Sequence, residues 1–142
     1  MTARSTLKVL GVSAVCVAVL AACTQQSGGP AKGMPDYFYN ALLSSELART
    51  LARECGGPIA YNDDTWNDRL PQLEQQLLSD GYTTRDLQQI LSEVPVDRIR
   101  SDTEAFIADN SLQSGQAQSF CAAGRAEIAN GSEIGSFLRT SS

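Results

Sequence analysis

The segment DYFYNALLSSELARTLARE, residues 36–54, decides the fold class of this chain. Its apolar and small side chains recur at steps of three and four residues, which places them along one face of a helix. This face comprises Phe38, Ala41, Leu42, Ser45, Ala48, Ala52 and Cys55. Asp36 is a favourable N-cap residue and Gly56-Gly57-Pro58 stops a helix, so we expect a helix from about Asp36 to Glu54.

The second helical pattern ends at Asp80-Gly81 and contains a proline, Pro71. Its apolar residues are Trp66, Leu70, Leu73 and Leu77. Proline lacks the backbone N–H and clashes with the preceding turn, so we expect Pro71 to kink or split this helix.

Further helical patterns follow to the end of the chain, and no alternating strand pattern or internal repeat is present. A capping-box-like start at Thr83 opens a third helix that stops before Pro95, and a fourth covers about Val96 to Asp109. A fifth ends at Gly131, and Ser132 caps a last short helix that carries Ile134, Phe137 and Leu138. Short amphipathic helices must share a core, which predicts an all-α fold, a single small bundle of about five helices.

The start of the chain differs from this helical region in composition. Arg4 and Lys8 precede an apolar run from Val9 to Ala22, which at about 14 residues is too short to span a hydrocarbon core. The run ends on Leu20-Ala21-Ala22-Cys23, which resembles the lipobox of bacterial lipoprotein signal peptides. The resemblance implies cleavage before Cys23 and lipid on its thiol, and an ordinary cleaved secretory signal is the alternative.

Three segments are therefore expected: a signal peptide at 1–22, a lipidated flexible tether at 23–35 and a helical domain at 36–142. The tether is rich in Gly, Pro and polar residues, with Met34 its one sizeable apolar side chain. Such a segment cannot offset its ordering entropy by burial. Thr24 stands where an aspartate retains enterobacterial lipoproteins at the inner membrane. Its absence favours the periplasmic face of the outer membrane.

Composition excludes several classes of function. Removing Arg4 and Lys8 from the 11 basic residues leaves nine against 16 acidic ones, a net charge of −7. This charge disfavours electrostatic binding of nucleic acid. The chain has no histidine, which excludes Ser-His-Asp and Cys-His catalysis and removes the commonest transition-metal ligand. We expect neither a metal site nor a cofactor.

Of the four cysteines, Cys16 lies in the predicted signal peptide and Cys23 is the predicted lipidation site. Cys55 and Cys121 remain as an even pair in an exported, oxidising setting, which predicts a disulfide. It would close a loop of about 65 residues and stabilise the fold by roughly 4 kcal/mol. Two isolated thiols in a redox or metal site are the alternative, but the chain has no Cys-x-x-Cys motif and no third ligand.

The segment FCAAGRAEIANGSEIGSFLR, residues 120–139, resembles the C-terminal pattern of small exported alphaproteobacterial proteins of unknown function. Their pattern is Cys-x-x-Gly-Arg-x-Glu-Ile-x-x-Gly-Ser-x-Ile-Gly-x-x-Leu-Arg. These proteins are also similar in having an earlier cysteine and a Gly-Tyr-Ser/Thr turn, here Gly81-Tyr82-Thr83. The resemblance covers most of Asp36 to Arg139 and supports the fold and the disulfide. It brings no known activity, and the lipobox is a departure from the family.

Two interpretations of this C-terminal motif stay open. Gly124 lies one turn after Cys121, where a residue without a Cβ lets another helix approach the bridge, and Gly135 suggests a second close approach. The first interpretation is packing inside the domain. The second is a glycine-lined groove for a partner, with Arg125 and Arg139 at its rim, which makes all four residues candidate partner-binding residues.

The other side chains give no specific catalytic pattern. The acidic group Asn62-Asp63-Asp64 with Asp68 suits a helix start, and it lacks the glycine of a calcium loop. Trp66 fits a core stripe better than an aromatic binding face. The glutamates Glu46, Glu54, Glu74 and Glu93 are spread over several helices, so no catalytic pair can be assigned.

The expected function is binding. We expect a lipid-anchored, non-catalytic accessory that docks a protein partner in the cell envelope, and a pilotin-like lipoprotein is the closest analogy in size and architecture. The alternatives are a cell-wall-associated hydrolase or an inhibitor of such an enzyme, and a passive structural lipoprotein. A hydrolase without histidine would need two carboxyl groups facing each other across a cleft, roughly 5–9.5 Å apart.

Overall fold

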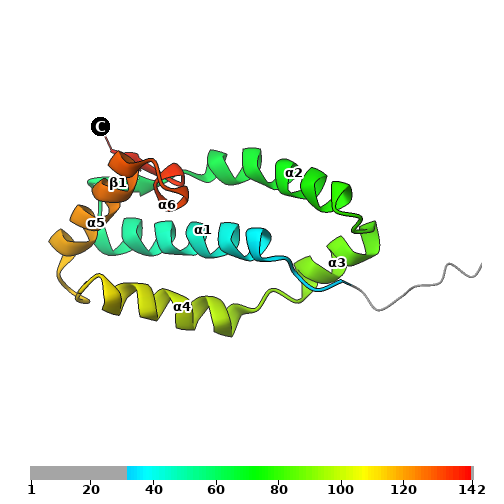
Figure 1. Ribbon diagram of the computed structural model, residues 1–142. Coiled ribbons are helices and arrows are strands. Elements are labelled where there is room, and N and C mark those ends of the chain that lie inside the picture. Colours follow the sequence, from blue (N-terminus) through cyan, green and yellow to red (C-terminus); the bar gives the residue numbers. More distant parts are fainter. Residues whose placement is uncertain (1–31, 142) are drawn as a thin grey trace, which may run out of the picture.

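The computed structural model describes residues 32–141, and this range is mostly helical (Figure 1). The predicted signal peptide and the lipidation site Cys23 lie outside the described residues. The helices are α1 (Asp36–Cys55), α2 (Asp63–Ser79), α3 (Thr84–Ser92), α4 (Val96–Asp109), α5 (Ala117–Asn130) and α6 (Glu133–Ser136). Two short strands, β1 (Ile59–Tyr61) and β2 (Leu138–Thr140), form an antiparallel pair. The predicted all-α class is confirmed.

Helix α1 is central in the domain. Figure 1 shows α2 along one side of it and α4 along the other, with α3 at one end and α5, α6 and the sheet at the opposite end. One core cluster lies around the disulfide end and includes Leu51, Phe120 and Phe137. A second lies toward α3 and joins Phe38, Ala41, Leu73, Leu77 and Ile90. Because α1 contributes to both clusters, its amphipathic pattern organises the whole bundle.

The helix ends follow the signals in the sequence. Thr83 and Asp86 form a reciprocal capping box at the start of α3. Helices α1 and α5 end at Gly56 and Gly131, whose φ angles of 71° and 61° lie in the left-handed region that glycine adopts without strain. These predictions of helix ends are confirmed. The expected cap of α1 is corrected: its N-cap is Pro35, and Asp36 is the first residue of the helix, where its charge is near the helix N-terminus.

Two expectations about secondary structure are corrected. Helix α2 runs through Pro71 without being split, since Pro71 lies inside the single helix Asp63–Ser79. Leu138 belongs to β2 and not to the last helix, and the β1–β2 pair has no counterpart among the predicted elements. Strands of three residues are too short to show an alternating pattern, so their pairing depends on the contacts of the folded chain.

The end of the predicted tether is fastened to the domain. The backbone N–H of Lys32 donates to Asp86 Oδ1 at 3.0 Å, and its Nζ donates to the carbonyls of Asp80 and Gly81 at 3.2 and 2.9 Å. The Tyr82 hydroxyl donates to the carbonyl of Gly33 at 3.1 Å. The chain therefore enters the domain along the turn between α2 and α3.

Candidate partner-binding groove

The predicted disulfide is confirmed. Cys55 at the end of α1 and Cys121 in α5 are bonded, with Cα atoms 4.7 Å apart, and both side chains are buried. The bond ties α1 directly to α5, as predicted. It also rules out the alternative in which the two cysteines act as free thiols.

The two glycines of the C-terminal motif face the interior. A Cβ at Gly124 would overlap the side chain of Ile59 in β1, and a Cβ at Gly135 would overlap the backbone of Glu127 in α5. The element that approaches the disulfide at Gly124 is thus a strand, where a helix was expected. Both glycines serve close packing inside the domain, whereas Arg125 and Arg139 are exposed.

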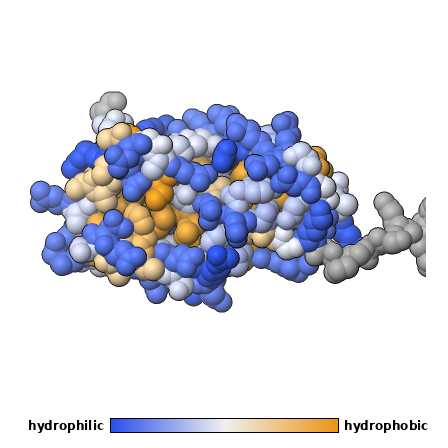
Figure 2. All heavy atoms as spheres, in the orientation of Figure 1, coloured by the Kyte–Doolittle hydropathy of each residue, from blue (hydrophilic) through white to orange (hydrophobic). Residues whose placement is uncertain are grey.

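A groove of about 580 Å³ lies elsewhere, between α1 and α4, with Trp66 of α2 and Val94 also lining it. Its apolar lining residues are Leu42, Trp66, Val94, Val96, Ile99 and Ile107, and its polar ones are Ser45, Glu46, Arg49, Thr50, Arg53, Arg100, Thr103 and Glu104. Figure 2 shows one face of the molecule, where apolar atoms are exposed among hydrophilic ones over the C-terminal half of α1. The groove combines an apolar surface with a charged rim.

The buried hydroxyl groups in the groove are already hydrogen-bonded. The hydroxyls of Ser45 and Tyr61 lie 2.7 Å apart, and Thr103 Oγ1 donates to the carbonyl of Ile99 at 2.7 Å. Among the described residues, no buried side-chain N or O atom lacks a hydrogen-bond partner. An incoming ligand therefore meets apolar surface and rim charges, and no unsatisfied polar atom lies in the floor.

Three arginines line the groove. Arg49 Nη2 lies 3.7 Å from Asp63 Oδ1, and its guanidinium lies 4.1 Å from the centre of the Tyr61 ring. Arg100 Nη1 donates to Asp97 at 3.0 Å. All three arginines are exposed, so these surface ion pairs contribute little net stability.

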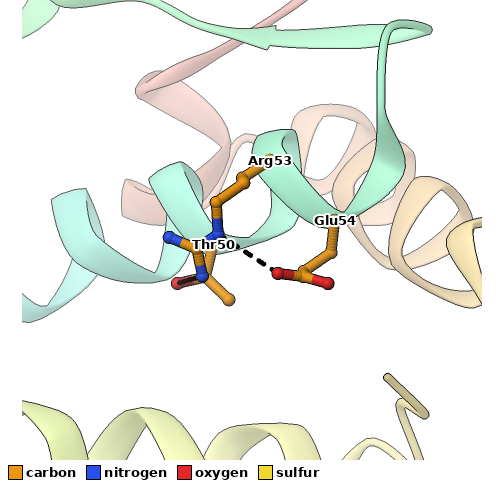
Figure 3. Close-up of polar contacts among 3 residues, drawn as sticks. All are labelled: Thr50, Arg53 and Glu54. Carbon is orange, nitrogen blue, oxygen red and sulfur yellow. Dashed lines mark hydrogen bonds and ion pairs between the residues drawn. The ribbon is translucent and has the colours of Figure 1, made fainter. Parts of the chain in front are cut away.

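Arg53 is held by its own helix. Its Nε donates to Glu54 Oε1 at 3.1 Å, and its Nη2 donates to Thr50 Oγ1 at 3.5 Å. Figure 3 shows these three side chains on the side of α1 that faces α4, and Thr50 and Arg53 line the groove. Arg49 and Arg53 also line a second hollow of about 490 Å³ beside β1, so the two arginines stand between adjoining concavities.

The spacing of α1 and α4 is maintained by a cluster of Tyr39, Asp102 and Arg98. The Tyr39 hydroxyl donates to Asp102 Oδ2 at 2.6 Å, and the Arg98 guanidinium lies 3.8 Å from the centre of the Tyr39 ring. Burial, followed by the hydrogen bond to Asp102, raises the pKa of Tyr39 to about 12. The phenol therefore stays protonated and keeps its bond between the two helices at neutral pH.

Sequence reasoning assigned Trp66 to the core and did not identify the groove arginines. Trp66 is half-buried: it packs against both core clusters and also lines the groove. The positions of Arg49 and Arg53, one turn apart on α1 and in step with Leu42 and Ser45, carried a usable signal. That spacing does not show that α4 forms the opposite wall of the groove.

These features define a small, disulfide-bonded helical domain with an open, arginine-lined groove. The chain belongs to the Family of unknown function (DUF5333), whose model matches residues 33–139. This confirms the resemblance to a family of unknown function. No curated protein and no solved structure matches the chain.

No helix within residues 32–141 is long and apolar enough to cross a membrane. The same range has no group of three or more acidic, cysteine or histidine side chains placed to hold a metal ion.

Proposed function

We propose that this protein is a lipid-anchored, non-catalytic docking module of the bacterial cell envelope, which binds a helical segment of a partner protein in the groove between α1 and α4. The observation that carries the proposal is the groove itself, because it presents apolar side chains that the domain does not cover. Grooves of this kind receive the apolar face of an amphipathic helix.

The dimensions of the groove fit such a segment. Its wall on α1 runs from Leu42 to Arg53, which is about 16 Å along the helix axis. Its wall on α4 runs from Val96 to Ile107, the same length. Each wall thus matches about three turns of a partner helix, long enough for anchors at positions i, i+3, i+4 and i+7.

The proposed anchor would keep the domain close to the bilayer. From Cys23 to Lys32 the chain has nine steps, and a coil of that length has an r.m.s. reach of roughly 16 Å. Acyl chains on Cys23 would contribute about 0.8 kcal/mol per buried methylene group, and two or three of them would make a stable anchor. By analogy with pilotins, the module would act at the periplasmic face of the outer membrane, as a scaffold or assembly factor for an envelope protein.

Site-specific photo-crosslinking in cells tests this proposal. A photo-reactive amino acid at Glu46 or Glu104 is expected to crosslink an envelope protein, and the same group at the exposed residue Ala126 of α5 serves as the matched control. The crosslinked peptide should be an amphipathic helix, and a synthetic copy should change the fluorescence of Trp66, which is the chain's one tryptophan. Crosslinks that occur equally from Ala126, or that map to no amphipathic segment, would contradict docking in the groove.

A second candidate function has one specific observation in its favour. Glu46 on α1 and Glu104 on α4 both line the groove, as a carboxylate-based hydrolase acting on the cell wall would need. Glu104 is exposed to water, however, so it lacks the shielded setting that suits a general acid. This function would be favoured over docking if the protein released soluble fragments from purified peptidoglycan and if both Glu46→Gln and Glu104→Gln abolished that release.

A further inference from the structure

From the groove we infer that the docked segment is acidic: an amphipathic helix whose carboxylates, one turn apart, pair with Arg49, Arg53 and Arg100. This inference rests on the proposed docking function and specifies the chemistry of the partner. It differs from that function in naming charge, and not apolar contact alone, as the property that selects the partner.

The distribution of charge supports an acidic segment. Residues 32–141 contain nine basic side chains against 16 acidic ones, and three of the nine line this one groove. Two acidic residues, Glu46 and Glu104, share the lining, so the groove carries a net positive charge on a net negative chain. The rest of the chain repels an acidic segment, whereas the arginines of the lining can bind it by exchanging Asp63, Glu54 and Asp97 for its carboxylates, which favours one docking position.

The arginines are available to a partner. Their present acidic neighbours, Asp63, Glu54 and Asp97, lie outside the groove lining. Since each of these ion pairs involves an exposed arginine, a partner carboxylate can replace or join it at small cost. Arginine presents five N–H donors in a planar fork, which suits bidentate binding of a carboxylate.

The positions of the arginines set the pattern of the partner. Arg49 and Arg53 are four residues apart on α1, about 6 Å along its axis, and Arg100 lies on the opposite wall of the groove, α4. Carboxylates at positions i and i+4 of a docked helix have the same spacing. Its apolar face would then meet Ile99, Ile107 and Trp66 along the groove.

Fluorescence titration of the full-length mature protein in detergent tests this inference with two synthetic peptides. Both form three-turn amphipathic helices with the same leucine face; one carries glutamates at i and i+4 of its polar flank and the other carries lysines. We expect the glutamate peptide to shift the Trp66 emission with at least a tenfold lower Kd than the lysine peptide. The difference should shrink at high salt, because exposed charges are screened.

Variants assign the preference to the groove. The double variant Arg49→Gln/Arg53→Gln is expected to lose most of the tenfold preference, whereas Arg69→Gln/Arg85→Gln, which changes two arginines outside the groove lining, should keep it. Thermal melts of both variants check that the fold is intact. A preference retained in the Arg49/Arg53 variant would overturn the assignment to these residues.

The other outcomes separate the inference from the docking proposal. Equal affinity for the two peptides, or tighter binding of the lysine peptide, would overturn the acidic partner and leave docking in the groove supported. A Trp66 signal that neither peptide changes would overturn both the inference and the proposed function.

Discussion

Gly124 is the residue at which the helical and strand parts of the domain meet. It is buried in α5, and the side chains of Ile59 from β1 and Leu138 from β2 lie over it. A methyl group at this position would come too close to Ile59 Cδ1, so the Ile59 side chain would have to move. The absence of a Cβ therefore makes room for Ile59 beside the disulfide.

Replacing this glycine should destabilise the domain. In Gly124→Ala the new methyl group overlaps Ile59, so we expect a loss of about 1–3 kcal/mol in the free energy of unfolding, the usual range for overpacking. Urea denaturation followed by circular dichroism measures this change. Gly33→Ala is the matched control, since a Cβ at Gly33 meets no atom within 4 Å. Equal free energies of unfolding for the two variants would show that Ile59 moves aside without loss of stability.

Asp86 is the second residue with a defined physical role. Its carboxylate accepts hydrogen bonds from the backbone N–H and hydroxyl of Thr83, both at 2.7 Å, and from the backbone N–H of Lys32. The bond from the Thr83 hydroxyl, followed by the backbone bonds from Thr83 and Lys32, lowers the pKa of Asp86 below its ordinary value. The ionised carboxylate therefore contributes stability in the folded state.

This shift predicts a dependence of stability on pH. A lowered folded-state pKa gives stability that is present above the unfolded value, about 3.9, and is lost as pH falls through the folded value. We expect Asp86→Asn to be less stable at pH 7 and to lose less further stability than the wild type on acidification from pH 5 to pH 2. Thermal melts across this range provide the measurement, with the exposed Asp68→Asn as control. Parallel pH profiles for Asp86→Asn and the wild type would count against this role.

At the scale of elements, the domain depends on the contact between α1 and α5. The bond between Cys55 and Cys121 joins positions 66 residues apart in the chain, and both cysteines belong to the core cluster around the disulfide end. In the chain-entropy account, a closed loop of this length contributes about 4 kcal/mol to stability. That is a large share for a domain of this size, for which about 5–15 kcal/mol is usual.

The two cysteine variants should behave alike. Cys55→Ser and Cys121→Ser each remove the same bond, so we expect them to lower the melting temperature by similar amounts and the double variant to lower it no further. Differential scanning calorimetry compares them, and the wild-type protein under reducing conditions is the reference. Clearly unequal losses would indicate that one cysteine has a role apart from the bond.

Considered as a whole, the molecule has two distinct ends. The chain enters at the α2–α3 turn, where Lys32 and Gly33 are fastened, while the sheet and the disulfide lie at the opposite end (Figure 1). The groove runs along α1 between these ends. A lipid on Cys23 would thus hold the α3 end toward the bilayer.

Removal of the predicted lipidation site tests this arrangement. In Cys23→Ser we expect the protein to leave the membrane fraction, or to remain as an unprocessed precursor without the lipid mass. Cell fractionation and intact-mass spectrometry measure both effects. Cys16→Ser is the matched control, since Cys16 lies within the predicted signal peptide and should not affect the outcome. Unchanged mass and membrane retention in Cys23→Ser would show that the protein is not a lipoprotein.

The sequence by itself determined the features that depend on neighbours along the chain. The helical periodicity of α1, the capping box at Thr83 and Asp86, and the terminating glycines all act within one or two helical turns, so they could be predicted without a structure. The disulfide could also be predicted, because two of the four cysteines were assigned to the N-terminal segment and one pair remained.

Only the tertiary structure decided which elements and side chains pack against one another. The pairing of Ile59 with Thr140 joins strands of three residues, which depend on the packing of α1 against α5 to meet. Whether Gly124 would face a partner or the interior depended on the position of β1. The groove likewise depends on how α4 lies beside α1, since residues of both helices line it and the Tyr39 hydroxyl bonds Asp102 between them. Such contacts join residues far apart in the chain, so they follow from how the helices pack and not from any local pattern.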